Sequence, residues 1–352
     1  MNRYALAQRN VPPRGFRFAS RLVLFACLCC GAAAGPGFGA GGEDLSRPDA
    51  GGPPTQVQIG LYLVDLYEVS GPDQTFQADV VIRAQWRDSR LAGRWDGLHS
   101  LALDDVWHPR LLVVNQRGIS ASLPQRVEVD PSGLVQYRQR WWGRFSARLD
   151  LREFPLDRQQ LHIQVVSLGY RREEVNLTAN TAELKSGRAE ALSITDWAVG
   201  PARLERADYA PGPGAKALAG VRLGWEAKRY AGYYAVQVIL PLVFIVLMGW
   251  TAVWVDPAVV ATRMSVSMTT MLTLIAYRFA LGKSVPNLTY LTRFDYFMMA
   301  STVLIFLMLL LVAAGARLAG QGKTPLVHRI DLWVRVVFPV VFGVVFCLAW
   351  WG

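Results

Sequence analysis

Residues 263–283 read RMSVSMTTMLTLIAYRFALGK, an apolar segment that carries several hydroxyl side chains. If this segment is a helix, six of its positions follow one another at intervals of four, three, four, three and four and share one face. These positions are Ser265, Thr269, Leu272, Ala276, Phe279 and Lys283. Hydroxyl groups lie at one end of the face, apolar residues follow, and a lysine ends it. A helix that faces only lipid does not need these hydroxyl groups.

This graded face predicts a water-filled path between several copies of the helix. Rings of hydroxyl groups can replace part of the hydration shell of an ion, and a ring of Leu272 side chains can close the path by dewetting. Alternatively, the Ser and Thr residues hydrogen-bond across an ordinary helix bundle. The order of polar and apolar residues along one face favours the pore interpretation.

Three further apolar runs accompany this segment, and 52% of the 352 residues are hydrophobic. Each run is long enough to cross a bilayer as a helix. The predicted helices span about 231–255, 260–283, 292–317 and 329–351. The short connection between the last two is basic and is therefore expected to be cytoplasmic.

The N-terminal part resembles export and linker sequences. Residues 1–40 combine several arginines with an apolar run, Leu22 to Ala34, that is too short to span a membrane. They are predicted to form a signal peptide, and residues 41–55, rich in Gly and Pro, a flexible leader. Four crossings after export return the C-terminus to the outer side of the membrane, where the N-terminal domain also lies.

Residues 56–229 show period-two alternation in short segments separated by turn residues, which predicts an all-β sandwich of the immunoglobulin-like type. The complete prediction is this extracellular sandwich followed by an α-helical bundle of four transmembrane helices over residues 230–352. The cysteines are confined to positions 27, 29, 30 and 347, so no disulfide framework or zinc site is expected in between. No metal or cofactor is predicted.

Enzymatic and nucleic-acid-binding functions are not indicated. No Gly-rich phosphate loop or catalytic triad pattern is present, and the adjacent carboxylates Asp104 and Asp105 would point to opposite faces of a strand. Although the formal charge is +10, the arginines are scattered and form no basic helix. The chain is therefore predicted to be no enzyme and to bind no nucleic acid.

At this point the motifs resemble those of the pentameric ligand-gated ion channels, or Cys-loop receptor superfamily, especially prokaryotic members without the disulfide. The resemblance covers about residues 56–352. Its elements are Trp86-Arg87-Asp88, Trp107-His108-Pro109 with Asn115, Phe154-Pro155-Leu156-Asp157, Arg229, Pro241, the pore-helix segment 263–273 and Pro286.

The resemblance implies a homopentamer that conducts small inorganic ions, sits among membrane lipids and opens when a small-molecule agonist or protons bind. It implies that the β domain is coupled to the pore through Phe154, Pro155, Asp157, Arg229 and Pro286. The alternative is that these motifs serve packing and turn geometry, with Asp157 and Arg229 forming a weak surface ion pair.

Agonists of this family look to be held by aromatic residues between subunits, and the candidates here are Trp86, Tyr170 and Tyr209. The aromatic set is incomplete, because Leu168 stands where another ring would be expected. Proton activation is the alternative, and the candidate titrating groups are Glu68, Asp73, Asp88, His108 and His162.

Ion selectivity is expected to depend on Ala261, Thr262 and Arg263, at the start of the second helix. Cation-selective relatives usually carry a carboxylate ring there, so its absence predicts anion preference or weak selectivity. Asp256 could still supply a negative ring, which leaves a cation-selective channel as the alternative. The alternative hypotheses are a non-conducting membrane-anchored solute receptor and an exported carbohydrate-active enzyme.

Overall fold

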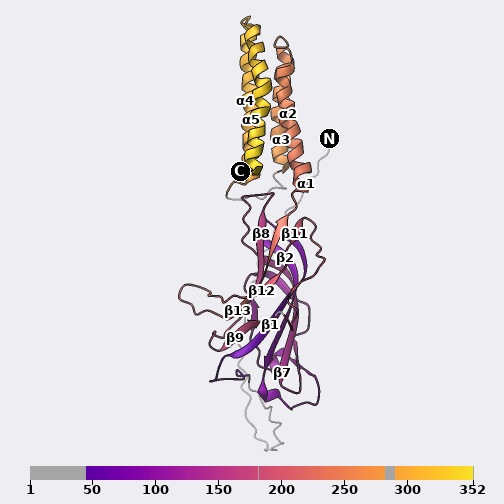
Figure 1. Cartoon of the computed structure of the whole chain (residues 1–352), viewed down its shortest axis with the longest axis vertical. Helices are drawn as coiled ribbons and strands as arrows, with labels where there is room; N and C mark the ends of the chain where they lie inside the picture. Colours follow the sequence, from indigo (N-terminus) through magenta and orange to yellow (C-terminus); the bar gives the residue numbers. More distant parts are fainter. Residues whose placement is uncertain (1–44, 181, 282–289, 352) are drawn as a thin grey trace, which may run out of the picture. The chain divides into compact units, whose positions relative to one another are not determined.

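A computed structural model describes residues 45–180, 182–281 and 290–351 of the chain. A domain of β-strands comes first, and long helices follow (Figure 1). The predicted signal peptide, residues 1–40, lies outside the described residues. Of the predicted leader, residues 45–54 form turns and Thr55 already begins the first strand.

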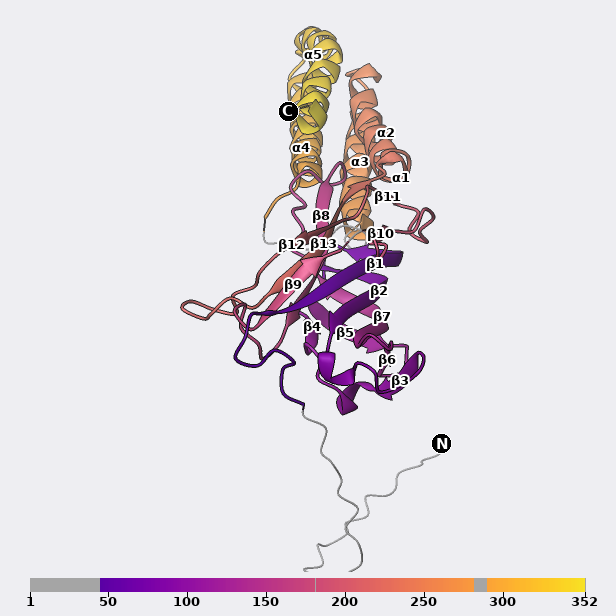
Figure 2. The ribbon, with the colours of Figure 1, turned by 60° about the horizontal axis from the view of Figure 1, so that its bottom comes forward.

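The strands of the described region form two sheets, whose order can be followed in Figure 2. The larger sheet runs β10 (Gly187–Arg188), β1 (Thr55–Ser70), β2 (Thr75–Arg87), β7 (Leu134–Ser146), β6 (Arg126–Val129) and β3 (His99–Ala102), with β5 (Gln116–Ala121) on β7 and β9 (Val175–Ala179) on β1. The smaller sheet runs β11 (Trp197–Val199), β13 (Gly220–Arg229), β8 (Arg158–Ser167) and β4 (Leu111–Val113), with β12 (Arg203–Arg206) on β13.

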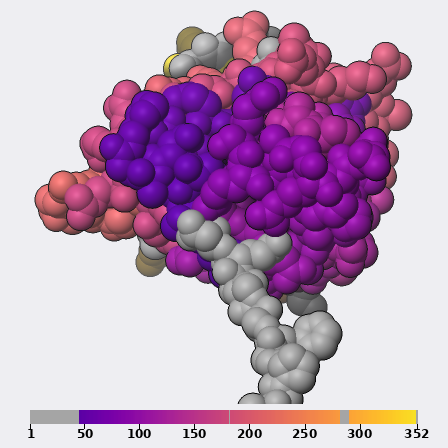
Figure 3. All heavy atoms as spheres, turned by 90° about the horizontal axis from the view of Figure 1, so that it is seen from below, coloured from indigo at the N-terminus to yellow at the C-terminus, as the bar shows by residue number. Residues whose placement is uncertain are grey.

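The alternation read from the sequence places one side of each strand in the core. In β13, Val221, Leu223, Trp225 and Ala227 are buried, whereas Glu226 and Lys228 between them are exposed. Successive side chains of a strand point to opposite faces, so this pattern buries one face of the smaller sheet. The predicted sandwich is confirmed. Figure 3 views one end of it, covered by residues of the early, indigo to purple strands.

An aromatic cluster joins the two sheets. Phe76 of β2 stacks on Phe145 of β7 with ring centroids 5.4 Å apart, and it meets Trp225 of β13 edge-on at 5.6 Å. Phe76 and Phe145 are completely buried. Rings of this size bury large apolar areas, and their edge-to-face contacts add to that gain.

Four apolar segments long enough to span a membrane follow the sandwich: Gly232–Trp254, Val260–Leu281, Arg293–Gly320 and Thr324–Trp350. The first consists of α1 (Gly232–Tyr234), the π-helical turn Ala235–Ile239, α2 (Leu240–Trp250) and a 3₁₀ turn (Thr251–Trp254). Pro241 explains the π-helical turn, because proline cannot donate a helical hydrogen bond to the preceding turn. The remaining helices are α3 (Val260–Leu281), α4 (Arg293–Gly320) and α5 (Thr324–Trp351).

The connection between α4 and α5 is shorter than the sequence suggested. Only Gln321–Lys323 separate the two helices, whereas helix ends at about 317 and 329 were expected. Gly322 adopts a φ of 77°, a conformation that glycine accepts readily and that permits the tight turn. Pro325 does not delay the start of α5, because proline is tolerated in the first turn of a helix.

Replacing Phe76 with Ala should remove the contact between the sheets and cost about 3–5 kcal/mol of unfolding free energy, which lowers Tm by roughly 10 °C. Circular dichroism of the full-length protein in detergent measures this. Tyr67→Ala, at a side chain that is 46% exposed, is the control and should change Tm little. Equal effects of the two changes would contradict the assignment of Phe76 to the inter-sheet core.

Candidate functional site

The two sides of α3 have different surroundings. Ser265, Thr269, Leu272, Ala276 and Phe279 are all exposed in the isolated subunit, with Leu272 at 68% and Phe279 at 81%. The opposite side packs within the bundle through Ser267, Thr270 and Leu274. The five described positions of the predicted face are therefore exposed in the isolated subunit and available to water or to other subunits. Lys283, which was predicted to end it, lies outside the described residues.

Arg263 does not belong to that face. Its side chain is 4% exposed, and its Nη2 lies 2.7 Å from Oδ1 of Asp331 on α5, which is 1% exposed. Because Arg263 is buried and Ser265 is exposed, the two side chains do not share a face; the contribution of Arg263 to ion selectivity stays a prediction. Ala261 and Thr262 are exposed. Their side chains, rather than that of Arg263, extend the exposed side of α3.

A buried ion pair lies where the smaller sheet ends and the helices begin. Nε of Arg229, the last residue of β13, lies 2.8 Å from Oδ1 of Asp157, and Nη2 lies 3.3 Å from Oδ2. The two side chains are 5% and 1% exposed, so the pair is not a surface ion pair. Gln159 Nε2 donates to the same carboxylate at 2.7 Å.

Aromatic rings enclose this guanidinium. Trp197 lies 4.1 Å from its central carbon, Phe154 5.1 Å and Tyr234 of α1 5.8 Å. Ring faces attract the cation through their quadrupoles. These contacts hold three elements together: the loop 149–157 before β8, the end of β13 and the first turn of the first span.

The same loop also contacts the start of α4. The Leu151 N–H donates to Tyr290 Oη at 3.0 Å, the Arg293 N–H donates to the Arg152 carbonyl at 2.9 Å, and Phe154 lies 6.4 Å from Phe294. A capping box between Thr292 and Asp295 fixes this helix end. Sequence reasoning missed Tyr290 and Arg293, because nothing in the linear pattern pairs them with the loop. Pro155 lies in this loop, and Pro286 lies outside the described residues.

The three predicted ligand-binding aromatic residues occupy different environments. Trp86 is 2% exposed and meets Trp107 edge-on, and Trp107 Nε1 donates to Tyr170 Oη at 2.9 Å. The Arg110 guanidinium lies 5.9 Å from the ring centre of Tyr170. Tyr209 lies in the exposed hairpin between β12 and β13, which projects from the sandwich (Figure 2). The buried Trp86 lines a small cavity of about 180 Å³ together with His108 and Tyr137.

A second cavity, of about 430 Å³, was not expected from the sequence. It opens on β2, β6 and β7 and is lined by three arginines, Arg83, Arg126 and Arg138, and by Glu128. Arg83 and Arg138 are direct cross-strand partners. Like charges directly opposite one another destabilise a sheet, so an anion bound between them would relieve this repulsion. The signal in the sequence was the alternation of arginines in β2 and β7, but which of them face one another depends on strand register.

The part of the chain that forms this sandwich is similar to known proteins. Residues 43–201 match the neurotransmitter-gated ion-channel ligand-binding domain. The chain is also 25% identical over 274 residues to the gamma-aminobutyric acid receptor subunit beta-4 of Gallus gallus. That alignment covers 75% of this chain and 55% of the relative, so the chain spans about half of the length of that protein. These relatives are receptors and not enzymes, which confirms the expectation that this chain is no enzyme.

Two histidines of the β-sandwich are half-buried. Burial lowers the pKa of His108, with Asp104 opposing the shift and Arg110 adding to it. Burial and Arg222 lower the pKa of His162, and Glu205 opposes this. Both are therefore neutral at neutral pH. Of the predicted acidic groups, Asp88 is buried in an ion pair with Arg90, Glu68 accepts a hydrogen bond from Gln77, and Asp73 accepts one from Ser70.

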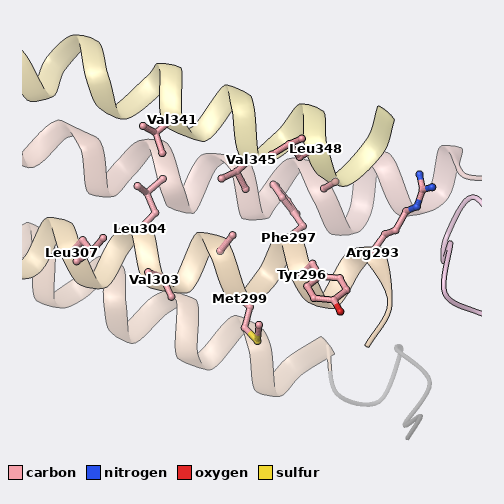
Figure 4. A pocket seen from close by; sticks show the side chains of 12 residues that line it. Arg293, Tyr296, Phe297, Met299, Val303, Leu304, Leu307, Val341, Val345 and Leu348 are labelled. Atoms are coloured by element: carbon pink, nitrogen blue, oxygen red, sulfur yellow. The ribbon is translucent and has the colours of Figure 1, made fainter. Parts of the chain in front are cut away.

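An apolar groove of about 620 Å³ runs between α4 and α5 (Figure 4). Val303, Leu304 and Leu307 of α4 face Val341 and Val345 of α5 along it, and Arg293 and Tyr296 mark one end. Such a lining suits the acyl chains of lipids. Among the residues that the structure describes, no group of three or more His, Cys, Asp or Glu side chains could hold a metal ion.

Asp157→Asn should lower the unfolding free energy by about 3–5 kcal/mol, because it leaves Arg229 buried without a counter-charge. The nearby ion pair Arg158–Glu226, with side chains 63% and 45% exposed, supplies the control. Glu226→Gln should change stability by about 1 kcal/mol or less. Thermal unfolding of the full-length protein distinguishes the two; a loss at Glu226→Gln as large as that at Asp157→Asn would contradict a special role of the buried pair.

The pH dependence of stability should follow from the two histidines. Because their folded pKa values lie below the ordinary value of 6.5, the unfolded chain takes up these protons first as pH falls. Tm should therefore decrease as pH is lowered from the ordinary histidine range towards the lowered values. His162→Gln should flatten this dependence, because it removes one of the two groups whose pKa is lowered. An unaltered profile in His162→Gln would refute the contribution of that residue.

Proposed function

We propose that this chain is one subunit of a homopentameric ligand-gated ion channel in which α3 lines the pore. The observation that carries this proposal is the graded face of α3, from Ser265 to Phe279, whose side chains are exposed in the described part of the subunit. A symmetric ring would place that face around a common axis. The match of residues 43–201 to a ligand-binding domain of ion channels supports gating by a ligand.

In the proposed mechanism, the ring of Leu272 side chains closes the pore and ligand binding opens it. An apolar constriction excludes water and ions until the helices tilt or rotate to widen it. The contacts around Phe154, Asp157 and Arg229 give the motion of the sandwich a route to α1, while Tyr290 and Arg293 give it a route to α4. A few partly buried charges at such a junction can bias a two-state interface. Pro155 and Pro286 are proposed to shape the same junction.

The agonist is proposed to be a small molecule with an anionic group. The cavity of Arg83, Arg126 and Arg138 supports an anion more strongly than the aromatic residues support an amine. Arg110 already lies over the ring of Tyr170 and would repel a cationic ligand at that face. Activation by protons is the second proposal. The lowered pKa values of His108 and His162 would place the pH of activation on the acidic side of the ordinary histidine range.

The pore is proposed to prefer anions or to select weakly, because Ala261 and Thr262 extend the exposed side of α3 without a carboxylate. Asp256 is exposed before α3 and keeps a cation-selective pore as the alternative. We further propose a bacterial inner-membrane location, with the ligand-binding domain and the C-terminus periplasmic and lipids in the groove between α4 and α5.

Cysteine substitutions in the full-length channel test the pore. Ser265→Cys, Thr269→Cys and Leu272→Cys should react with aqueous thiol reagents and lose current, on the order of tenfold faster than Thr270→Cys, whose side chain is buried. All four positions lie on α3, so the experiment compares exposed and buried positions of the same helix. Chloride replacement then tests selectivity: a shift in reversal potential supports anion conduction, and no shift refutes it.

Absence of current in a planar bilayer, with folding intact, would instead favour a non-conducting membrane-anchored solute receptor. Equal reactivity at Thr270 and Thr269 would remove the basis for the proposed pore face. The agonist proposal has its own test, because Arg83→Gln and Arg138→Gln should weaken activation by anionic compounds more than Arg87→Gln does.

A further inference from the structure

The end of the helix bundle remote from the sandwich contains a charged contact between α5 and the connection of α2 to α3. Asp331 of α5 pairs with Arg263 of α3 at 2.7 Å, and both side chains are almost fully buried. One turn later on α5, Arg335 donates from Nε and Nη2 to the Val253 carbonyl at 3.2 and 3.1 Å. Its guanidinium also lies 4.5 Å from the ring centre of Trp254.

We propose that Asp331 is a positioning residue of the pore: by its buried ion pair it holds Arg263 away from the ion path and so leaves Ala261, Thr262 and Ser265 to determine selectivity there. This inference rests on the proposed channel function. It assigns to α5, whose most apolar stretch has the smallest buried share of the four spans, a direct influence on the pore-lining helix.

Helix geometry supports the separation of Arg263 from the pore face. Each residue turns the helix by about 100°, so Arg263 points about 160° away from Ser265, whereas Ala261, four residues before Ser265, lies on nearly the same side. The side chain of Arg263 can remain there only while its charge is compensated, because an unpaired charge in a membrane-spanning bundle is costly.

The pair is also poorly supported by other contacts. Nε of Arg263 and Oδ2 of Asp331 have no hydrogen-bond partner among the described residues. Replacement of the carboxylate by an amide therefore leaves the guanidinium without its ionic partner in the described part of the bundle. A long, flexible arginine side chain then gains free energy by turning towards water. In an assembled pore, arginines that turned towards the ion path would add a ring of positive charge to it.

Asp331→Asn in the full-length channel tests the inference. We expect the chloride-to-sodium permeability ratio, obtained from reversal potentials in salt gradients, to rise roughly threefold or more, because a positive ring attracts anions. The double variant Asp331→Asn with Arg263→Gln should return to the wild-type ratio. Arg329→Gln, at an exposed charge two residues earlier on α5, is the matched control and should leave the ratio unchanged.

A purely structural ion pair would predict loss of stability without a change in selectivity. An Asp331→Asn channel that assembles and conducts with the wild-type permeability ratio would therefore overturn the inference, as would an equal shift in the double variant. Thermal unfolding gives a readout that does not require conduction: Arg263→Asp combined with Asp331→Arg should recover stability lost in each single variant. If no variant and no wild-type protein conducts, the proposed function fails, whereas this recovery still reports on the pair.

Discussion

The buried ion pair between Arg229 and Asp157 is the constraint on which the arrangement of the two structural regions depends. The backbone leaves the smaller sheet at Arg229 and enters the first span within a few residues. A guanidinium enclosed by Trp197, Phe154 and Tyr234 requires its carboxylate partner, because an uncompensated charge in these surroundings is costly. The requirement ties the loop before β8, the end of β13 and α1 to one another.

The same principle operates at the opposite end of the bundle. Arg263 and Asp331 form the second deeply buried ion pair of the described region, this time between α3 and α5. Each pair connects elements far apart in sequence, by 72 residues in one case and 68 in the other. Exposed ion pairs such as Arg158–Glu226 connect neighbouring strands and are screened by water. The two buried ion pairs therefore fix the positions of secondary-structure elements, whereas the exposed ion pairs contribute little to the arrangement.

Between these two ends, α3 has one face that packs against the bundle and one face that is exposed. Thr270 and Leu274 pack against the rest of the bundle, whereas Thr269 and Leu272 remain exposed. Packing of one face leaves the other free to line a pore in an assembled ring. The β-sandwich shows a similar division, since the arginines of β2 and β7 project from a strand pair whose opposite face lies in the core.

The sequence by itself determined the sandwich, the four apolar spans and the exposed face of α3, because these depend on periodicities of two and of about 3.6 residues that are local properties of the chain. The resemblance also singled out Asp157 and Arg229, and the structure pairs the two side chains. Tertiary structure alone decided that Arg263 turns inward to Asp331, that Trp86 is buried, and that Arg83 and Arg138 face one another. Partner choice across many intervening residues depends on strand register and helix packing, and no local pattern encodes either of them.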